Sequence, residues 1–125
     1  MKIHHIGIAC NDIEAKIQEI KNVQEVYFCS DIIFDEQQSA SVCLLKPKEG
    51  IPIELVSGKP VLDLVKRGLT YYHLGYTVSN ITAESERLRG AGVIPVTAPK
   101  PAILFDNRLV AFFYSPYGLI ELIEE

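Results

Sequence analysis

Short runs of alternating hydrophobic and polar residues dominate the first half of this chain, and one stretch changes to a helical spacing. Ile13, Ile17 and Ile20 follow the i, i+4, i+7 spacing of an amphipathic helix, which we expect over 12–21 with Asp12 as its N-cap. Runs rich in β-branched and aromatic residues predict a strand near 2–10 and β-rich segments near 24–34, 39–46 and 51–57. The first half therefore has the order strand, helix, then strands.

The second half shows the same succession of patterns. It follows a short linking helix expected over 61–67, which Gly68 closes. A helix is predicted over 82–90, with glycines at its end. Strands are predicted near 70–78, 93–97, 101–105, 108–114 and 118–123. The order strand, helix, then strands is thus repeated.

The two halves can be aligned directly on each other. Residues 5–13 fall on residues 73–81, with His, Gly and Ile identical at three positions. We therefore expect a single domain over 1–125 with an internal repeat of about 1–58 and 69–125. Its expected fold class is α+β, with two βαβββ modules that are each too small to bury a core alone. Pseudo-twofold symmetry would relate the modules, and their mixed, curved sheet would form a cleft.

Composition and charge narrow the function classes. The 125 residues are 48% hydrophobic, with 12 Lys+Arg against 16 Asp+Glu and a net charge of −4. No basic run exceeds two residues, so nucleic acid is not an expected partner. No apolar stretch approaches the roughly 20 residues of a membrane helix, and no secretion signal is recognised. Three cysteines without a Cys-x-x-Cys spacing fit a reducing cytoplasm, where we expect the protein.

The repeat singles out polar residues that both halves share. Each half has one histidine at the start of its first strand and one glutamate on its last. The pairs are His5 with Glu54 and His73 with Glu121, separated by 49 and 48 residues. Two imidazoles and two carboxylates suit one divalent ion, Zn, Ni, Co, Mn or Fe(II), which we expect in the cleft. Such an ion polarises a carbonyl or enolate oxygen, and a nearby carboxylate can move a proton.

Each of these residues also has a purely structural explanation. A glutamate such as Glu54 can face solvent on one side of an antiparallel sheet, and His73 can be a core histidine bonded to a carbonyl. His4 competes with His5, but strand neighbours point to opposite faces and the repeat selects His5. Aromatic residues of the second half are expected in the core rather than at the site. These are Tyr76, Phe112, Phe113 and Tyr114.

Two loop residues of the second half are candidates for substrate binding. Arg108 can hold an anionic part of a substrate, because a guanidinium matches the geometry of a carboxylate or phosphate. Asn107, its neighbour, is the second candidate. The alternative for Arg108 is a solvated loop arginine paired with Asp106.

The residues around the four shared positions resemble the vicinal-oxygen-chelate superfamily, which includes glyoxalase I, methylmalonyl-CoA epimerase, extradiol dioxygenases and bleomycin-resistance proteins. The resemblance rests on residues 5–9, 53–55, 72–75 and 118–122 and covers essentially the whole chain. It implies paired βαβββ modules, a homodimer and a divalent metal. The ligands that it implies are His5, Glu54, His73 and Glu121.

Two branches of the superfamily compete. A His/Glu/His/Glu set is similar to that of bacterial glyoxalase I, whereas residues 35–38, 107–109 and 116–121 look closer to the acyl-CoA epimerases. The epimerases' separate glutamate base falls at about Val42. The arginine with which glyoxalases bind glutathione falls at about Ala9. Neither activity therefore transfers unchanged.

Together these observations predict a metal-dependent isomerase or lyase acting on a small molecule. The substrate, an oxo-acyl compound such as an acyl-CoA or a thiol adduct as in lactoylglutathione lyase, would pass through an enolate or enediolate. Glu121 is expected to remove the proton, and Glu54 is the second catalytic carboxylate. The first alternative is a non-catalytic small-molecule binding or resistance protein. The second is an extradiol-type dioxygenase with two histidines and one carboxylate on Fe(II).

Overall fold

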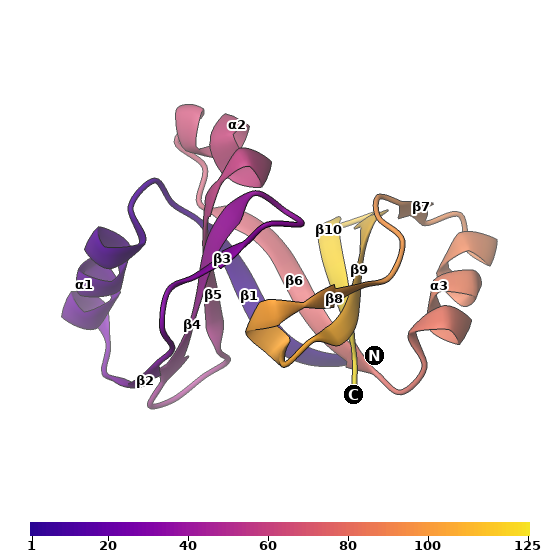
Figure 1. Cartoon of the computed structure of the whole chain (residues 1–125), viewed down its shortest axis with the longest axis horizontal. Helices are drawn as coiled ribbons and strands as arrows, with labels where there is room; N and C mark the ends of the chain where they lie inside the picture. Colours follow the sequence, from indigo (N-terminus) through magenta and orange to yellow (C-terminus); the bar gives the residue numbers. More distant parts are fainter. The chain divides into compact units, whose positions relative to one another are not determined.

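The computed structural model describes residues 1–125 and divides into two compact units. The first unit is His5–Tyr72, and the second is His73–Glu125 together with Met1–His4. Each unit combines α-helix with parallel and antiparallel strand pairs, so the expected α+β class is confirmed (Figure 1). Neither unit has a helix with the length and apolar character needed to cross a membrane.

The first unit follows the predicted order of strand, helix and strands. Its elements are β1 (Lys2–Ala9), α1 (Ile13–Val23), β2 (Val26–Cys29), β3 (Ile33–Asp35), β4 (Ala40–Pro47), β5 (Ile53–Gly58), the 3₁₀ turn η1 (Lys59–Val61) and α2 (Leu62–Lys66). The first residues of β1 belong to the second unit. The hydrogen-bonded order is β2-β4-β5-β1, with β4 and β5 antiparallel and β5 and β1 parallel.

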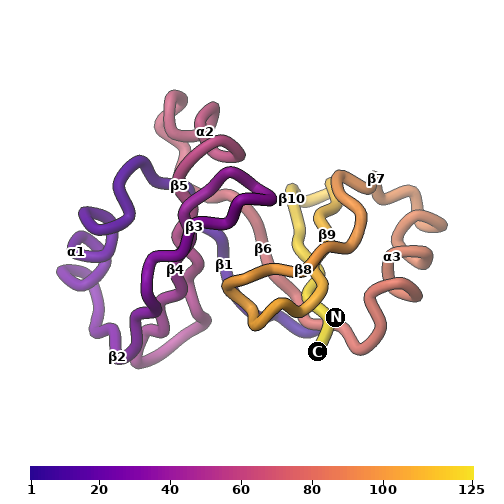
Figure 2. Tube along the Cα trace, in the orientation of Figure 1, coloured from indigo at the N-terminus to yellow at the C-terminus, as the bar shows by residue number.

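The β-rich segment predicted near 24–34 forms strands as expected, but it is interrupted. The structure has two separate strands, β2 and β3, which both pair with β4 (Figure 2). Ser30 lies at the break between them. Its hydroxyl accepts the backbone N–H of Leu44 at 2.8 Å, a bond that a carbonyl accepts in a regular ladder, and donates to the carbonyl of Asp31 at 2.9 Å. A side chain thus replaces the backbone at this point of the sheet edge.

Helix α1 packs on β4 and β5 through its isoleucine stripe. The buried side chains at this contact are Cys10, Ile13, Ile17, Cys43, Leu45 and Leu55. The carboxylate of Asp12 accepts the N–H of Ala15 at 3.1 Å, so the predicted N-cap is confirmed. Helix α1 runs two residues beyond the predicted end, because no glycine or proline stops it before Gln24.

The second unit has a matching series of elements. They are β6 (Tyr71–Val78), α3 (Ile81–Gly90), β7 (Ile94–Pro95), β8 (Lys100–Ala102), the 3₁₀ turn η2 (Ile103–Phe105), β9 (Arg108–Ser115) and β10 (Gly118–Glu124). The hydrogen-bonded order is β6-β10-β9-β7, and β8 also pairs with β9. Strands β6 and β10 are parallel, whereas β10 and β9 form an antiparallel hairpin.

Helix α3 packs against the sheet of the second unit as α1 does in the first. Its core residues are Val78, Ile81, Leu88, Ala111, Phe113, Ile120 and Leu122. The Asn80 side chain caps the helix by accepting the N–H of Ala83 at 3.0 Å. The chain leaves the helix through Gly92, whose φ of +84° is a left-handed conformation that glycine adopts without strain.

Two expectations for the second unit are wrong. The strand predicted over 101–105 ends at Ala102, because the 3₁₀ turn η2 occupies 103–105; Asp106 and Asn107, in left-handed backbone (φ 56° and 60°), then turn the chain back into β9. Tyr114 is 56% exposed instead of buried. Tyr114 follows Phe113 near the end of β9 and so points to the face opposite the core under α3, whereas Phe112 and Phe113 are buried as expected.

Tyr76 is only half-buried, so its expected core position holds in part. Its hydroxyl lies 3.1 Å from the hydroxyl of Tyr117. This hydrogen bond, together with burial, raises the pKa of Tyr76 to about 12, so the phenol stays protonated at neutral pH.

Candidate functional site

The first unit brings His5 and Glu54 together. Nε2 of His5 lies 3.0 Å from Oε1 of Glu54, and the residues are 0% and 4% exposed. Glu54 therefore does not face solvent, as strand alternation alone would have allowed. Burial of a carboxylate is unfavourable unless the charge is paired or binds a cation, which makes this pair a candidate for more than packing.

The register of two parallel strands explains how the pair meets. Glu54 on β5 lies opposite Gly7 on β1, not opposite His5. Because alternate strand residues share a face, His5 and Gly7 point to the same side as Glu54. Gly7 has no side chain, so nothing on β1 stands between the imidazole and the carboxylate.

The second unit builds the same arrangement from β6 and β10. Glu121 lies opposite Gly75, two residues after His73, which repeats the register of the first unit. Potential metal-ligand atoms of His73 and Glu121 lie within 4.8 Å of each other. Both residues are buried, His73 at 5% and Glu121 at 2% exposure.

Aromatic rings contact the second histidine and its neighbourhood. The Phe112 ring meets the His73 imidazole edge-on, with centroids 5.3 Å apart and an angle of 89°. Sequence reasoning assigned Phe112 to the core alone. Its position opposite Glu121 in the β9–β10 hairpin is the signal that links it to the site. His4, the alternative to His5, is half-buried, and its ring contacts the Phe105 ring edge-on with centroids 5.4 Å apart.

The donor set fits a divalent metal. His5, Glu54, His73 and Glu121 are buried residues of the types that could hold a metal ion. Imidazole nitrogen and carboxylate oxygen together suit Zn and the neighbouring first-row divalent ions better than the hard cations Ca and Mg, which take oxygen ligands alone. The residues therefore pass the chemical test for the expected cofactor, without indicating which ion it is.

The loop candidates are placed differently from the buried pairs. The half-buried Arg108 donates from Nε to the Phe105 carbonyl at 3.1 Å, and its guanidinium lies 6.0 Å from the Phe105 ring centre. It does not pair with Asp106, the alternative considered from sequence. Asn107 is exposed in the tight turn before β9. Contact of either residue with a substrate stays a prediction.

The two positions at which the family resemblance led us to expect a glutamate base and a glutathione-binding arginine hold apolar residues in this protein. Val42 and Ala9 are 1% and 2% exposed, and neither side chain can transfer a proton or hold an anion. Glu54 and Glu121, which are also candidate metal ligands, are the carboxylates that the structure buries beside the two histidines.

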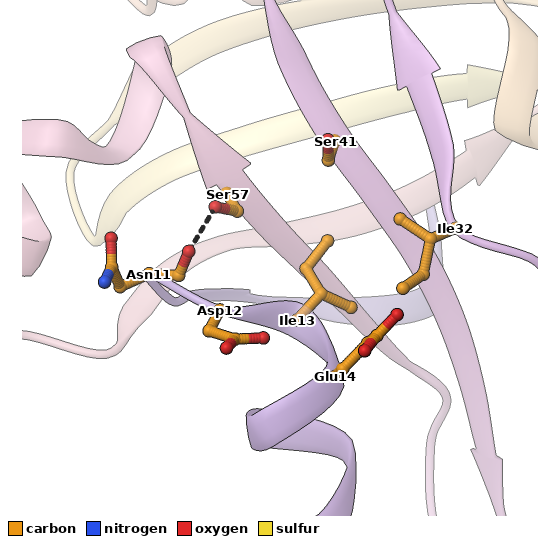
Figure 3. A pocket seen from close by; sticks show the side chains of 7 residues that line it. All are labelled: Asn11, Asp12, Ile13, Glu14, Ile32, Ser41 and Ser57. Carbon is orange, nitrogen blue, oxygen red and sulfur yellow. Dashed lines mark hydrogen bonds between the residues drawn. The ribbon is translucent and has the colours of Figure 1, made fainter.

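A separate pocket of about 430 Å³ lies in the first unit where α1 begins (Figure 3). Ser41 and Ser57, which are register partners on β4 and β5, line it together with residues of the α1 start. The Ser57 hydroxyl donates to the carbonyl of Asn11 at 2.8 Å. Ser57 is three positions from Glu54 and thus on the other face of β5, so this pocket does not contain the Glu54 carboxylate.

Solved structures with this fold include methylmalonyl-CoA epimerases. The enzyme from Mycobacterium tuberculosis superposes with a TM-score of 0.82 at 25% sequence identity, covering 98% of this chain and 87% of that chain. The hypothetical protein BH1468 from Bacillus halodurans C-125 gives 0.78 at 24% identity, over 99% and 94%. A Streptomyces coelicolor methylmalonyl-CoA epimerase variant in complex with 2-nitronate-propionyl-CoA gives 0.77 at 21% identity, over 100% and 94%. The last two likenesses concern the fold alone.

Comparison with curated protein sequences gives no significant match. A family profile, that of the glyoxalase/bleomycin resistance protein/dioxygenase superfamily, matches residues 4–112. The matched span includes His5, Glu54 and His73 and ends before Glu121. It covers most of the chain, in agreement with the resemblance expected from sequence. The protein therefore belongs to the glyoxalase/bleomycin resistance protein/dioxygenase superfamily.

Proposed function

We propose that this protein is a divalent-metal-dependent isomerase that exchanges the proton next to the carbonyl of a small acyl thioester. The observation that carries the proposal is the buried His–Glu pair that each unit builds on the same strand register. A structural role alone does not require two such pairs, because buried carboxylates are unfavourable without a compensating charge.

The proposed metal ligands are His5, Glu54, His73 and Glu121. When bound, the ion would supply Lewis-acid polarisation of the substrate's carbonyl oxygen. Support comes from the donor types, from the burial of all four side chains and from membership of the superfamily. The stoichiometry proposed is one ion per site.

The carboxylates would carry the proton. In the proposed reaction Glu121 accepts the proton from the carbon next to the carbonyl, and the electron pair of the broken C–H bond passes into the enolate. Glu121 or Glu54 then returns a proton to either face of that carbon. With Val42 and Ala9 unable to take part, the two glutamates are the groups available for both steps.

An acyl-CoA is the substrate class that we favour over a hemithioacetal. The likeness to methylmalonyl-CoA epimerases covers nearly the whole chain, whereas the position of the glutathione-binding arginine of glyoxalases holds Ala9. We propose that Arg108 and Asn107 bind an anionic part of the substrate. The guanidinium of Arg108 is partly accessible and keeps N–H donors beyond the one directed to Phe105.

The test combines metal content with proton exchange. Protein purified without chelator is expected to hold about one Zn, Ni, Co, Mn or Fe(II) per chain, by elemental analysis, with loss of the metal in His5→Ala and Glu121→Ala. Incubation with methylmalonyl-CoA in D₂O, followed by mass spectrometry, measures exchange of the α-proton. The control is Glu49→Gln, which removes an exposed carboxylate and should change neither readout.

Two outcomes would contradict the proposal. A wild-type protein that is metal-free and cannot be loaded with any of the five ions would favour a non-catalytic binding protein. Exchange that appears only with a hemithioacetal would keep the metal site and replace the substrate class. An extradiol-type dioxygenase is disfavoured, because a second glutamate would occupy a position that dioxygen and substrate need.

A further inference from the structure

Two cysteines of the first unit lie unusually close together on the side of the sheet that carries α1. Sγ of Cys29 on β2 lies 3.7 Å from Sγ of Cys43 on β4. The strands are antiparallel with Cys29 opposite Leu45, so the two cysteines are diagonal neighbours on one face. Both are free thiols in the structure. A disulfide needs the sulfurs about 2 Å apart, so closing the remaining gap takes side-chain rotation and a small strand adjustment.

The two thiols differ in their exposure to solvent. Cys29 is exposed on the edge strand, whereas Cys43 is fully buried under α1. Burial raises the pKa of the Cys43 thiol to about 11, so this sulfur stays protonated at neutral pH. Cys29 is therefore the sulfur that an oxidant reaches first, and Cys43 is placed to react with it afterwards.

Both thiols form hydrogen bonds with Ser30. The carbonyl oxygen of Ser30 accepts from Sγ of Cys29 at 3.5 Å and from Sγ of Cys43 at 3.4 Å. The Ser30 hydroxyl in turn fixes the backbone of Leu44 next to Cys43. The same break that separates β2 from β3 thus turns two thiols toward each other. Cys10, the third cysteine, is buried and takes no part in this contact.

We propose that Cys29 and Cys43 form a peroxide-oxidisable pair that closes to an intrachain disulfide. In the first step the Cys29 thiolate attacks the O–O bond of a hydroperoxide and becomes a sulfenic acid, with an alcohol or water as leaving group. In the second step Cys43 Sγ attacks that sulfur, the S–S bond forms and the S–O bond breaks, and the departing hydroxide takes the Cys43 thiol proton and leaves as water. The two thiols supply the two electrons that reduce the peroxide. The product joins the edge strand β2 to β4 by a covalent bond.

Peptide mapping tests the proposal directly. The metal-loaded protein is treated with hydrogen peroxide, its remaining thiols are alkylated, and a protease that cleaves after glutamate separates peptide 26–36, with Cys29, from peptide 37–49, with Cys43. We expect these two peptides to be joined and to have lost the mass of two hydrogen atoms. Of the three thiols, only that of Cys10 should remain reactive in denaturant. The disulfide should also raise the midpoint of thermal unfolding, and a reductant should reverse the rise.

Matched variants keep the proposal open to contradiction. Cys10→Ala should behave as the wild type, whereas Cys29→Ser and Cys43→Ala should each abolish the joined peptides. If Cys43→Ala fails to fold, Cys29→Ser supplies the same comparison, because its side chain is exposed. Disulfide-linked chain dimers, or oxidation of Cys29 to sulfinic acid without joined peptides, would overturn the proposal. None of these readouts depends on enzyme activity, so failure here leaves the proposed function untouched.

Discussion

The two units place a histidine and a glutamate in the same way although the side chains around them differ. Both pairs rest on a parallel strand contact in which the glutamate faces a glycine, Gly7 in one unit and Gly75 in the other. Opposite the glutamates on the antiparallel side stand different residues, Leu44 and Phe112. Backbone register is therefore what the two pairs have in common, whereas the neighbouring side chains differ between the units.

The largest effect is expected from removing one carboxylate charge without changing its shape. Glu121→Gln and Glu54→Gln should each reduce α-proton exchange by about 10²–10⁴-fold, the usual contribution of a general base. If Glu121 is the first base, the rate of α-proton exchange falls further in Glu121→Gln than in Glu54→Gln. The metal content should fall only in part in both variants. Equal losses, measured as deuterium incorporation at fixed metal content, would mean that the two units share the proton transfer evenly.

The second expected effect tests the role of the glycines. Gly7→Val and Gly75→Val place a side chain between the histidine and glutamate of one pair. Metal affinity should fall about 10–100-fold, the range for disturbed support of metal ligands, as measured by competition with a chromophoric chelator. Gly90→Val is the control, since a Cβ at Gly90 meets nothing within 4 Å. Unchanged metal affinity in both Gly7→Val and Gly75→Val would show that the glycine opposite each glutamate is not needed to position the histidine and glutamate of that unit.

A smaller effect is expected when the second unit is made like the first. Phe112→Leu introduces the residue type found at the equivalent position 44 and removes the ring edge that contacts His73. We expect metal affinity to fall about 2–10-fold, which corresponds to the ~0.5–1.5 kcal/mol of an edge-to-face pair. Phe113→Leu, which alters the core under α3 instead, should lower the free energy of unfolding without this change in affinity.

The smallest expected effect is on stability, and it compares two ion pairs, one in each helix, in which acid and base follow each other in opposite order along the chain. Lys16 bonds Glu19 in α1 at 2.8 Å, whereas in α3 the acid comes first, with Glu84 bonded by Nε of Arg87 at 2.8 Å. Only the α3 order places the negative charge toward the helix N-terminus, where the helix dipole favours it. Glu84→Gln should therefore destabilise the protein slightly more than Glu19→Gln in urea unfolding at neutral pH.

The pH dependence of this last effect has a defined sign. The hydrogen bond from Arg87 holds the pKa of Glu84 below its ordinary value of 4.5. A lowered pKa in the folded state adds stability above the ordinary pKa and loses it as the pH falls through the lowered one. The difference between wild type and Glu84→Gln should accordingly shrink from pH 7 to pH 3. A difference that stays constant would mean that the pair acts through packing, not charge.

The sequence predictions that the structure confirms rest on short-range patterns along the chain. Asp12 and Asn80 mark the helix starts because their side chains satisfy N–H groups that would otherwise lack partners. The repeat also singled out His5 and Glu54, which lie 3.0 Å apart in the structure, and their role as metal ligands stays a prediction. The α+β class followed from the alternation of strand and helix spacings.

The features that the sequence did not predict depend on contacts that a spacing does not reveal. The break between β2 and β3 comes from a hydroxyl of Ser30 that replaces a backbone acceptor, and many serines in strands do not do this. The exposure of Tyr114 depends on which face of β9 it takes near the strand end, opposite Phe113. The contact of Phe112 with His73 requires knowing that β6 and β9 both flank β10.

The register that brings Glu121 opposite Gly75 also has a consequence for folding. Side chains of β10 alternate between faces, and Ile120 and Leu122 pack in the core that α3 covers. A slip of one residue between β10 and β6 would turn the Glu121 carboxylate into that apolar core and bring the two hydrophobic residues out of it. The misaligned chain would be strongly unfavourable and short-lived. The carboxylate proposed for catalysis thus also helps the chain to select its native strand pairing.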